Sequence, residues 1–150
     1  MDLSILKQKS EQLGRMLETL HEAIEKYERE KRRLRDGVVH DDSDVRTCQD
    51  SVIQRFEYTI DGLWKCLRLH LINVDGVVLE GKGPKGIVRA ACLYKAISEA
   101  EAEQLLEMIE MRNQTSHLYK EEVASQVALA AVQGYPLLAA VYRRLSTNVA

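Results

Sequence analysis

Residues 44–73, DVRTCQDSVIQRFEYTIDGLWKCLRLHLIN, decide the fold of this chain. Apolar side chains recur in them at steps of three, four and seven residues, which places those side chains on one face of an α-helix. The core-facing positions are Val45, Val52, Phe56, Ile60, Leu63, Leu67 and Leu71, with Ile53 and Trp64 beside them. The pattern predicts a long amphipathic helix that ends at about Asn73.

A second long apolar stripe comes before this one, in residues 3–35. Its members are Ile5, Leu6, Leu13, Met16, Leu17, Leu20, Ile24 and Tyr27. Asp36 and Gly37 end this helix, and residues 40–44 form a short polar connection with several possible N-caps. Two long helices joined in this way are expected to pack as an antiparallel pair.

Shorter helices are predicted in the second half of the chain. Pro84 is typical of a first helical position, and the helix that it begins is expected to reach about Ile97. Ser98 followed by Glu101 forms a capping box, so a fourth helix should start there and run to residues 112–116. The apolar run 77–79 is the only β-like segment, and it is too short to build a sheet alone.

A fifth helix is expected to begin near Glu121 and Glu122, because acidic residues favour the first turn of a helix. The sequence Gly134-Tyr135-Pro136 should kink or split this helix before residues 137–145. These elements together predict an all-α, up-and-down bundle of four or five helices. With 150 residues, the chain is expected to form a single helical domain, residues 1–150.

Composition narrows the classes of function. Hydrophobic residues make up 45% of the chain and charged residues 29%, as in an ordinary globular protein. The net charge of −2 provides no overall positive field, so an RNA contact would be local or built by combining subunits. No signal peptide and no apolar run of about 20 residues are evident, so we expect a cytoplasmic protein that does not enter a membrane.

Neither the cysteines nor the polar connection at residues 40–44 predicts a metal site or a cofactor. Cys48, Cys66 and Cys92 are odd in number and widely spaced, which favours reduced, buried thiols over disulfides or metal ligands. His40 lies beside three aspartates, but neighbouring loop residues give no fixed ligand geometry, and a solvated helix cap is the better interpretation.

The candidate functional site is RNQTSHLY, residues 112–119. The apolar stripe of the fourth helix, which includes Leu105 and Ile109, continues into Arg112, Asn113 and Ser116. An unpaired guanidinium is costly to bury, so this change requires a partner, a cavity or a ligand. His117 lies five residues after Arg112, about 140° around an ideal helix. Either the helix therefore ends near residues 115–116, or a second subunit completes the pair.

Arginine and histidine together suit phosphodiester cleavage in RNA. A histidine can take the proton from a ribose 2′-hydroxyl or protonate the leaving oxygen, and an arginine can hold the phosphate and offset its growing charge. Such cleavage would be independent of metal. A structural interpretation stays open on this spacing alone: Arg112 pairs with Glu57 or Glu110, and His117 caps a helix.

Three segments of the chain resemble a known family. Residues 50–65 (DSVIQRFEYTIDGLWK), 84–89 (PKGIVR) and 106–119 (LEMIEMRNQTSHLY) resemble the nucleotidyltransferase substrate-binding proteins of the HEPN superfamily of helical bundles. The resemblance covers roughly residues 50–135. That family carries an R-x4-6-H signature, often extended to R-x4-H-x-Y. Arg112, His117 and Tyr119 satisfy the longer form, and Asn113 is the usual polar residue after the arginine.

The resemblance implies a homodimer or higher homo-oligomer in which two signatures meet as a ribonuclease site. Arg112, Asn113 and His117 would be catalytic, while Arg55, Glu57 and Ser116 would line or support the cleft; Gln54 belongs to the same phrase. The implied partner is a minimal nucleotidyltransferase (MNT) that acts as antitoxin and adenylylates Tyr119. Lys120 departs from the family, whose members often have an acidic residue there, and the final helix is longer than in compact members.

Two functions therefore remain in view. The first is a toxin ribonuclease of a HEPN–MNT toxin–antitoxin pair, which cleaves RNA without a metal or other cofactor. The second is a non-catalytic substrate-binding subunit of a two-component nucleotidyltransferase. The second function needs the dimer cleft and Tyr119, but it does not need His117 to act as an acid or base.

Overall fold

The long helix expected in residues 44–73 forms as α2, which spans Ser43–Asn73. A computed structural model describes residues 3–148 of the chain. Within that range the other helices are α1 (Ser4–Arg35), α3 (Pro84–Leu93), α4 (Glu99–Asn113) and α5 (Glu121–Thr147), with a 3-10 turn, η1 (Gln114–His117), between α4 and α5. The described residues contain no strand. The all-α bundle predicted from the sequence is confirmed.

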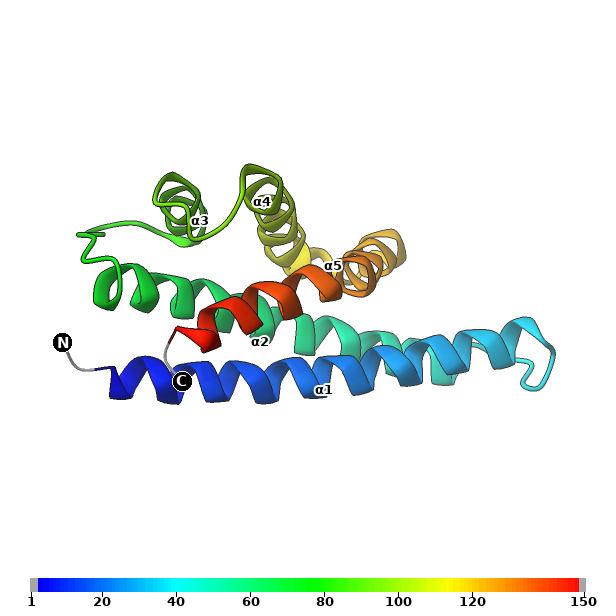
Figure 1. Ribbon diagram of the computed structural model, residues 1–150. Helices are drawn as coiled ribbons and strands as arrows, with labels where there is room; N and C mark the ends of the chain where they lie inside the picture. The colour runs from blue at the N-terminus through cyan, green and yellow to red at the C-terminus, as the bar shows by residue number, and fades with distance from the viewer. Residues whose placement is uncertain (1–2, 149–150) are drawn as a thin grey trace.

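Helices α1 and α2 form a long antiparallel hairpin, and the shorter helices pack on one side of it (Figure 1). Helix α2 is the central element, because it contacts α1, α3, α4 and α5. Its predicted core stripe is buried from Val52 to Leu71, and Leu13, Leu17 and Leu20 of α1 pack into the same core. Ile5 differs from the expectation, since 55% of it is exposed near the start of α1.

Glycines let the helices approach closely at two contacts. A Cβ atom on Gly62 would lie 2.8 Å from Met16 Sδ, at the contact between α1 and α2. A Cβ atom on Gly134 would lie 2.7 Å from Met108 Sδ, at the contact between α4 and α5. A side chain larger than glycine at either position would therefore require the end of the neighbouring methionine to shift. The glycines let these two methionine side chains pack directly against α2 and α5.

Helix α3 ends at Leu93, four residues before the predicted end at Ile97. Lys95 has a φ of 61°, and the amide of Ala96 donates to the carbonyl of Ala91. The amide of Lys95 also donates to the carbonyl of Cys92, which completes a Schellman motif. This left-handed position usually holds glycine, so a lysine there concealed the helix end in the sequence.

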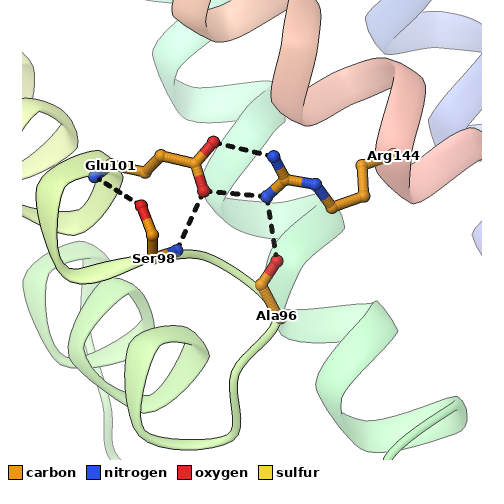
Figure 2. Close-up of polar contacts among 4 residues, drawn as sticks. All are labelled: Ala96, Ser98, Glu101 and Arg144. Atoms are coloured by element: carbon orange, nitrogen blue, oxygen red, sulfur yellow. Dashed lines mark hydrogen bonds and ion pairs between the residues drawn. The ribbon is translucent and has the colours of Figure 1, made fainter.

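The predicted capping box at the start of α4 is present, and its Glu101 side chain also bonds to Arg144 of α5 (Figure 2). Ser98 Oγ accepts from the amide of Glu101, and Glu101 Oε1 accepts from the amide of Ser98. Arg144 of α5 donates to both Glu101 oxygens at 2.8 Å and to the carbonyl of Ala96 at 3.2 Å. These hydrogen bonds, of which that to Arg144 contributes most, lower the pKa of Glu101 to about 2.

Helix α5 is continuous through Pro136, so of the predicted kink or split, the split does not form. The ribbon of α5 nevertheless changes direction along its length (Figure 1). Proline has no amide hydrogen to donate and its ring crowds the preceding turn, which accounts for a bend at this position. The two halves of α5 remain one helix because Leu138, Val141 and Leu145 are buried against the hairpin and hold the second half in place.

By length and composition alone, α5 is also able to cross a membrane, which differs from the absence of such a segment expected from the sequence. Its 27 residues include a face of buried side chains from Ala124 to Leu145. The core helix of a bundle has the same length and composition, so this feature does not distinguish the two settings.

The three cysteines are free, and all of them lie in the described part of the chain. Cys66 is buried as predicted, and burial raises the pKa of its thiol to about 11. Cys48 and Cys92 are half-buried against the core. Burial also raises the pKa of Cys48, with Glu30 and Asp44 adding to the effect.

Candidate functional site

The helix that carries Arg112 stops directly after the signature arginine. Helix α4 ends at Asn113, and η1 carries the chain to His117. The amide of Lys120 then donates to the carbonyl of His117 at 3.0 Å, and α5 begins at Glu121. The early helix end expected from the sequence forms, about two residues sooner than expected.

Arg112 is held by side chains from α2 and from η1. Its Nε and Nη2 donate to the two carboxylate oxygens of Asp61, each at 3.0 Å. Its Nη1 donates to Thr115 Oγ1 at 3.0 Å and lies 3.4 Å from Glu57 Oε2. The predicted pairing with Glu57 is confirmed, whereas Glu110 pairs with Lys85 instead. We call Arg112, Asp61, Glu57 and Thr115 the arginine clamp.

Asp61 was missed by the sequence reasoning, although a signal for it exists. It lies four residues after Glu57, so the two carboxylates share one face of α2. The hydrogen bond to Asp61 raises the pKa of Arg112, and the charges of Asp61 and Glu57 add to this effect while burial opposes it. Two carboxylates thus face one guanidinium, and the clamp carries a formal charge of −1.

His117 and Tyr119 lie outside the clamp, on the turn between α4 and α5. Tyr119 is 78% exposed, and its ring lies edge-on to that of His117 with 6.3 Å between centroids. Lys120 Nζ lies over the Tyr119 ring, 5.8 Å from its centroid. Within the described residues, His117 makes no side-chain hydrogen bond or ion pair, so the histidine cap of the structural interpretation does not form.

A hollow of about 380 Å³ opens beside the clamp. We call it the Trp64 hollow. It is lined by Ile60, Asp61, Trp64, Lys65, Pro84, Ile109, Arg112 and Asn113. The structure therefore gathers Arg112 and Asn113 with residues of α2 and the first residue of α3. His117 and Tyr119 are absent from this lining.

The other predicted cleft residues are spread more widely. Arg55 lines a separate hollow of about 260 Å³ against α1, together with Tyr58. Ser116 is exposed in η1, and Gln54 is exposed on α2. Of the three residues expected to support the cleft, only Glu57 touches Arg112 in the chain as described.

Of the histidine and aspartates before α2, Asp41 bonds to the first residue of the helix, whereas the N-cap residue Asp42 makes no side-chain cap hydrogen bond. Asp41 Oδ1 accepts from the amide of Ser43 at 3.0 Å and from its hydroxyl at 2.6 Å. The hydroxyl first, and then the amide, lower the pKa of Asp41. Among residues 3–148, no three histidine, cysteine, aspartate or glutamate side chains come close enough to hold a metal ion.

Comparisons with known proteins agree with this architecture. A crystal structure of a protein from Thermus thermophilus superposes with a TM-score of 0.65 and 28% sequence identity, covering 91% of this chain and 98% of that one. None of the curated proteins matches the chain. The family model described as nucleotidyltransferase substrate binding protein like matches residues 8–147, which include both the arginine clamp and the exposed turn. The chain belongs to the nucleotidyltransferase substrate-binding-like family.

Proposed function

We propose that this protein is the toxin ribonuclease of a HEPN–MNT toxin–antitoxin pair, and that it cleaves RNA without a metal ion. Its partner would be a minimal nucleotidyltransferase that neutralises it. The observation that carries the proposal is the turn that follows α4. In the described chain, the side chains of His117 and Tyr119 make no hydrogen bond, and Tyr119 is 78% exposed. They lie a few residues after Arg112, which Asp61 holds by two hydrogen bonds.

The reaction follows from the chemistry of these side chains. Neutral His117 would take the proton from a ribose 2′-hydroxyl as that oxygen forms a bond to the adjacent phosphorus. The bond from phosphorus to the 5′-oxygen breaks, and an imidazolium protonates the leaving oxygen. The products are a 2′,3′-cyclic phosphate and a 5′-hydroxyl. Arg112 and Asn113 would hold the phosphate and stabilise its developing charge. RNA is implied, because DNA lacks the 2′-hydroxyl.

Two copies of the chain suit this chemistry better than one. In a single copy, Arg112 lines the Trp64 hollow and His117 does not. A symmetric pair would supply two histidines and two arginines to one cleft, as the R-x4-H signature of the resembling family implies. The base and the acid of the reaction would then come from different subunits.

Tyr119 suits control by the partner. Its exposed phenolic oxygen would attack the α-phosphate of a nucleoside triphosphate held by the nucleotidyltransferase, with pyrophosphate as the leaving group. The attached AMP adds bulk and an anionic phosphate on the same turn as His117. This group would exclude RNA from the site both sterically and by charge repulsion.

The test is cleavage of a labelled structured RNA by the purified protein in EDTA. We expect His117→Ala to reduce the rate by about 10²-fold or more. His40→Ala, which removes an exposed histidine in the connection before α2, should match the unchanged protein. The products should carry cyclic phosphate ends. Equal cleavage by the His117→Ala variant would overturn the assignment of the site.

A second function, the non-catalytic substrate-binding subunit, is favoured by one observation. Asp61 and Glu57 outnumber the single guanidinium in the clamp, an arrangement that suits a structural ion pair as well as a phosphate site. This function predicts tight association with a nucleotidyltransferase but no RNA cleavage. Absence of cleavage by the unchanged protein, with the partner bound, would decide in its favour.

A further inference from the structure

The Trp64 hollow combines an apolar slot with groups that bind nucleotides. Ile60 and Ile109 are buried beneath it, and Trp64 forms a half-buried aromatic wall. Asn113, at the end of α4, contributes an exposed amide. An aromatic face, an aliphatic floor and an amide are the parts with which proteins stack and read a nucleobase.

We infer that the Trp64 hollow binds one nucleotide, with its base against Trp64 and its phosphate between Lys65 and Arg112. The inference rests on the proposed function, because it says where the nucleotide next to the reacting phosphate would lie. The volume of about 380 Å³ is near the lower end of small-molecule sites, which suits a single nucleotide rather than a longer segment.

The charges in the hollow allow this ligand. Asp61 is occupied by Arg112 through two hydrogen bonds, so the free charge at the rim is that of Lys65. Lys65 Nζ lies over the Trp64 ring, 5.8 Å from its centroid. A stacked base would replace the ammonium over the ring, and the ammonium would then be free to pair with the phosphate.

Arg112 also has donors left for a phosphate. Three of its five N–H groups are used by Asp61 and Thr115. The carboxylate of Glu57 lies 3.4 Å from Nη1. Arg112 and Lys65 together balance the charges of Asp61 and Glu57, so the formal charge of this region is zero. Stacking and hydrogen bonds, more than the electric field, would therefore supply the affinity.

The experiment uses the single tryptophan of the chain as its reporter. AMP and UMP are titrated into the full-length protein while Trp64 fluorescence is recorded, with inorganic phosphate as a control. We expect saturable quenching by a nucleotide and none by phosphate. Fluorescence that does not respond to either nucleotide would overturn the inference.

Two exposed side chains provide variants that preserve the core. Lys65→Ala and Asn113→Ala should each weaken nucleotide binding by about tenfold, whereas Lys7→Ala, on the exposed face of α1, should have no effect. Unchanged affinity in both variants would show that the quenching arises elsewhere. Trp64→Leu, checked for folding by circular dichroism, should lose binding when followed by calorimetry.

A short RNA with 2′-O-methyl groups shows whether the nucleotide bound in the hollow is part of an RNA strand or is the free nucleotide used by the partner. The modified RNA cannot be cleaved, because its 2′-oxygen is blocked. Competition with AMP would assign the hollow to RNA. Binding of AMP without competition would assign it to the nucleotide used by the partner, and both results support a nucleotide site.

The two proposals can fail separately. Cleavage that depends on His117, in a protein that binds no nucleotide in the Trp64 hollow, would overturn only this inference. Nucleotide binding in the hollow, in a protein that cleaves no RNA, would overturn the ribonuclease and leave the site intact.

Discussion

At the scale of the residue, Arg112 shows how a polar side chain is kept on the core-facing side of a helix. Only 28% of its side chain is exposed, and hydrogen bonds to Asp61 and Thr115 compensate for the water that it loses. The carboxylates of Asp61 and Glu57 also repel any phosphate that approaches the guanidinium. The clamp therefore fixes the position of Arg112, but its carboxylates also reduce the positive electrostatic potential around the guanidinium.

Removing one carboxylate should separate these two effects. We expect Asp61→Asn to lower the free energy of unfolding by about 1 kcal/mol, because the ion pair is partly exposed. The same change should strengthen binding of the 2′-O-methyl RNA, since less negative charge faces the phosphate. Denaturant unfolding and filter binding measure the two quantities, with Asp50→Asn on the same helix as the control. Weaker RNA binding would show that Asp61 positions Arg112 more than it opposes the phosphate.

At the scale of the element, α4 is anchored at both ends, by the capping box at its first turn and by Arg112 at its last. The capping box and Arg144 hold the first turn, and Arg144 links it to the second half of α5 (Figure 2). The other end passes into a 3-10 turn whose residues are largely exposed. The turn with His117 and Tyr119 is therefore accessible while the helix that precedes it is held in place.

The link between Arg144 and Glu101 should depend on pH. The carboxyl has a pKa of about 2 when folded, against 4.5 ordinarily, so its stabilisation is complete above pH 4.5 and is lost as the pH falls towards 2. We expect Arg144→Met to cost about 1 kcal/mol at pH 7, a value that allows for the exposure of Arg144. The loss should shrink between pH 4.5 and 2 in denaturant titrations.

The neighbouring Arg143→Met is the matched control, because Arg143 is exposed and its side chain makes no contact of this kind in the described chain. A loss of stability that stays constant from pH 7 to 3 would mean that Arg144 acts through packing of its aliphatic stem instead.

At the scale of the whole molecule, the proposed ribonuclease requires two copies. Mixing the inactive variants Arg112→Gln and His117→Ala should restore part of the RNA cleavage, because a mixed dimer keeps one intact arginine and one intact histidine. Activity is measured after the two proteins are unfolded and refolded together, beside each variant treated alone. Mixtures that stay inactive, although mass measurement shows mixed dimers, would contradict a composite site.

Most of the helices and the position of the signature were determined by the sequence alone. Apolar periodicity marked α1 and α2 because burial of one helical face dominates their stability, and the capping box marked the start of α4 because its hydrogen bonds are local. The end of α3 escaped prediction because it depends on Lys95 in a conformation typical of glycine. The continuity of α5 through Pro136 depends on packing that outweighs a local preference.

Tertiary structure alone decided the surroundings of the site. The sequence placed Arg112 on a core-facing stripe, but Asp61 and Arg112 lie 51 residues apart, so only the packing of α4 against α2 could bring them together. The same packing, with the first residue of α3, forms the Trp64 hollow and excludes His117 and Tyr119 from its lining. Local patterns specify helices because their hydrogen bonds are short in sequence, whereas a site is specified by contacts between helices.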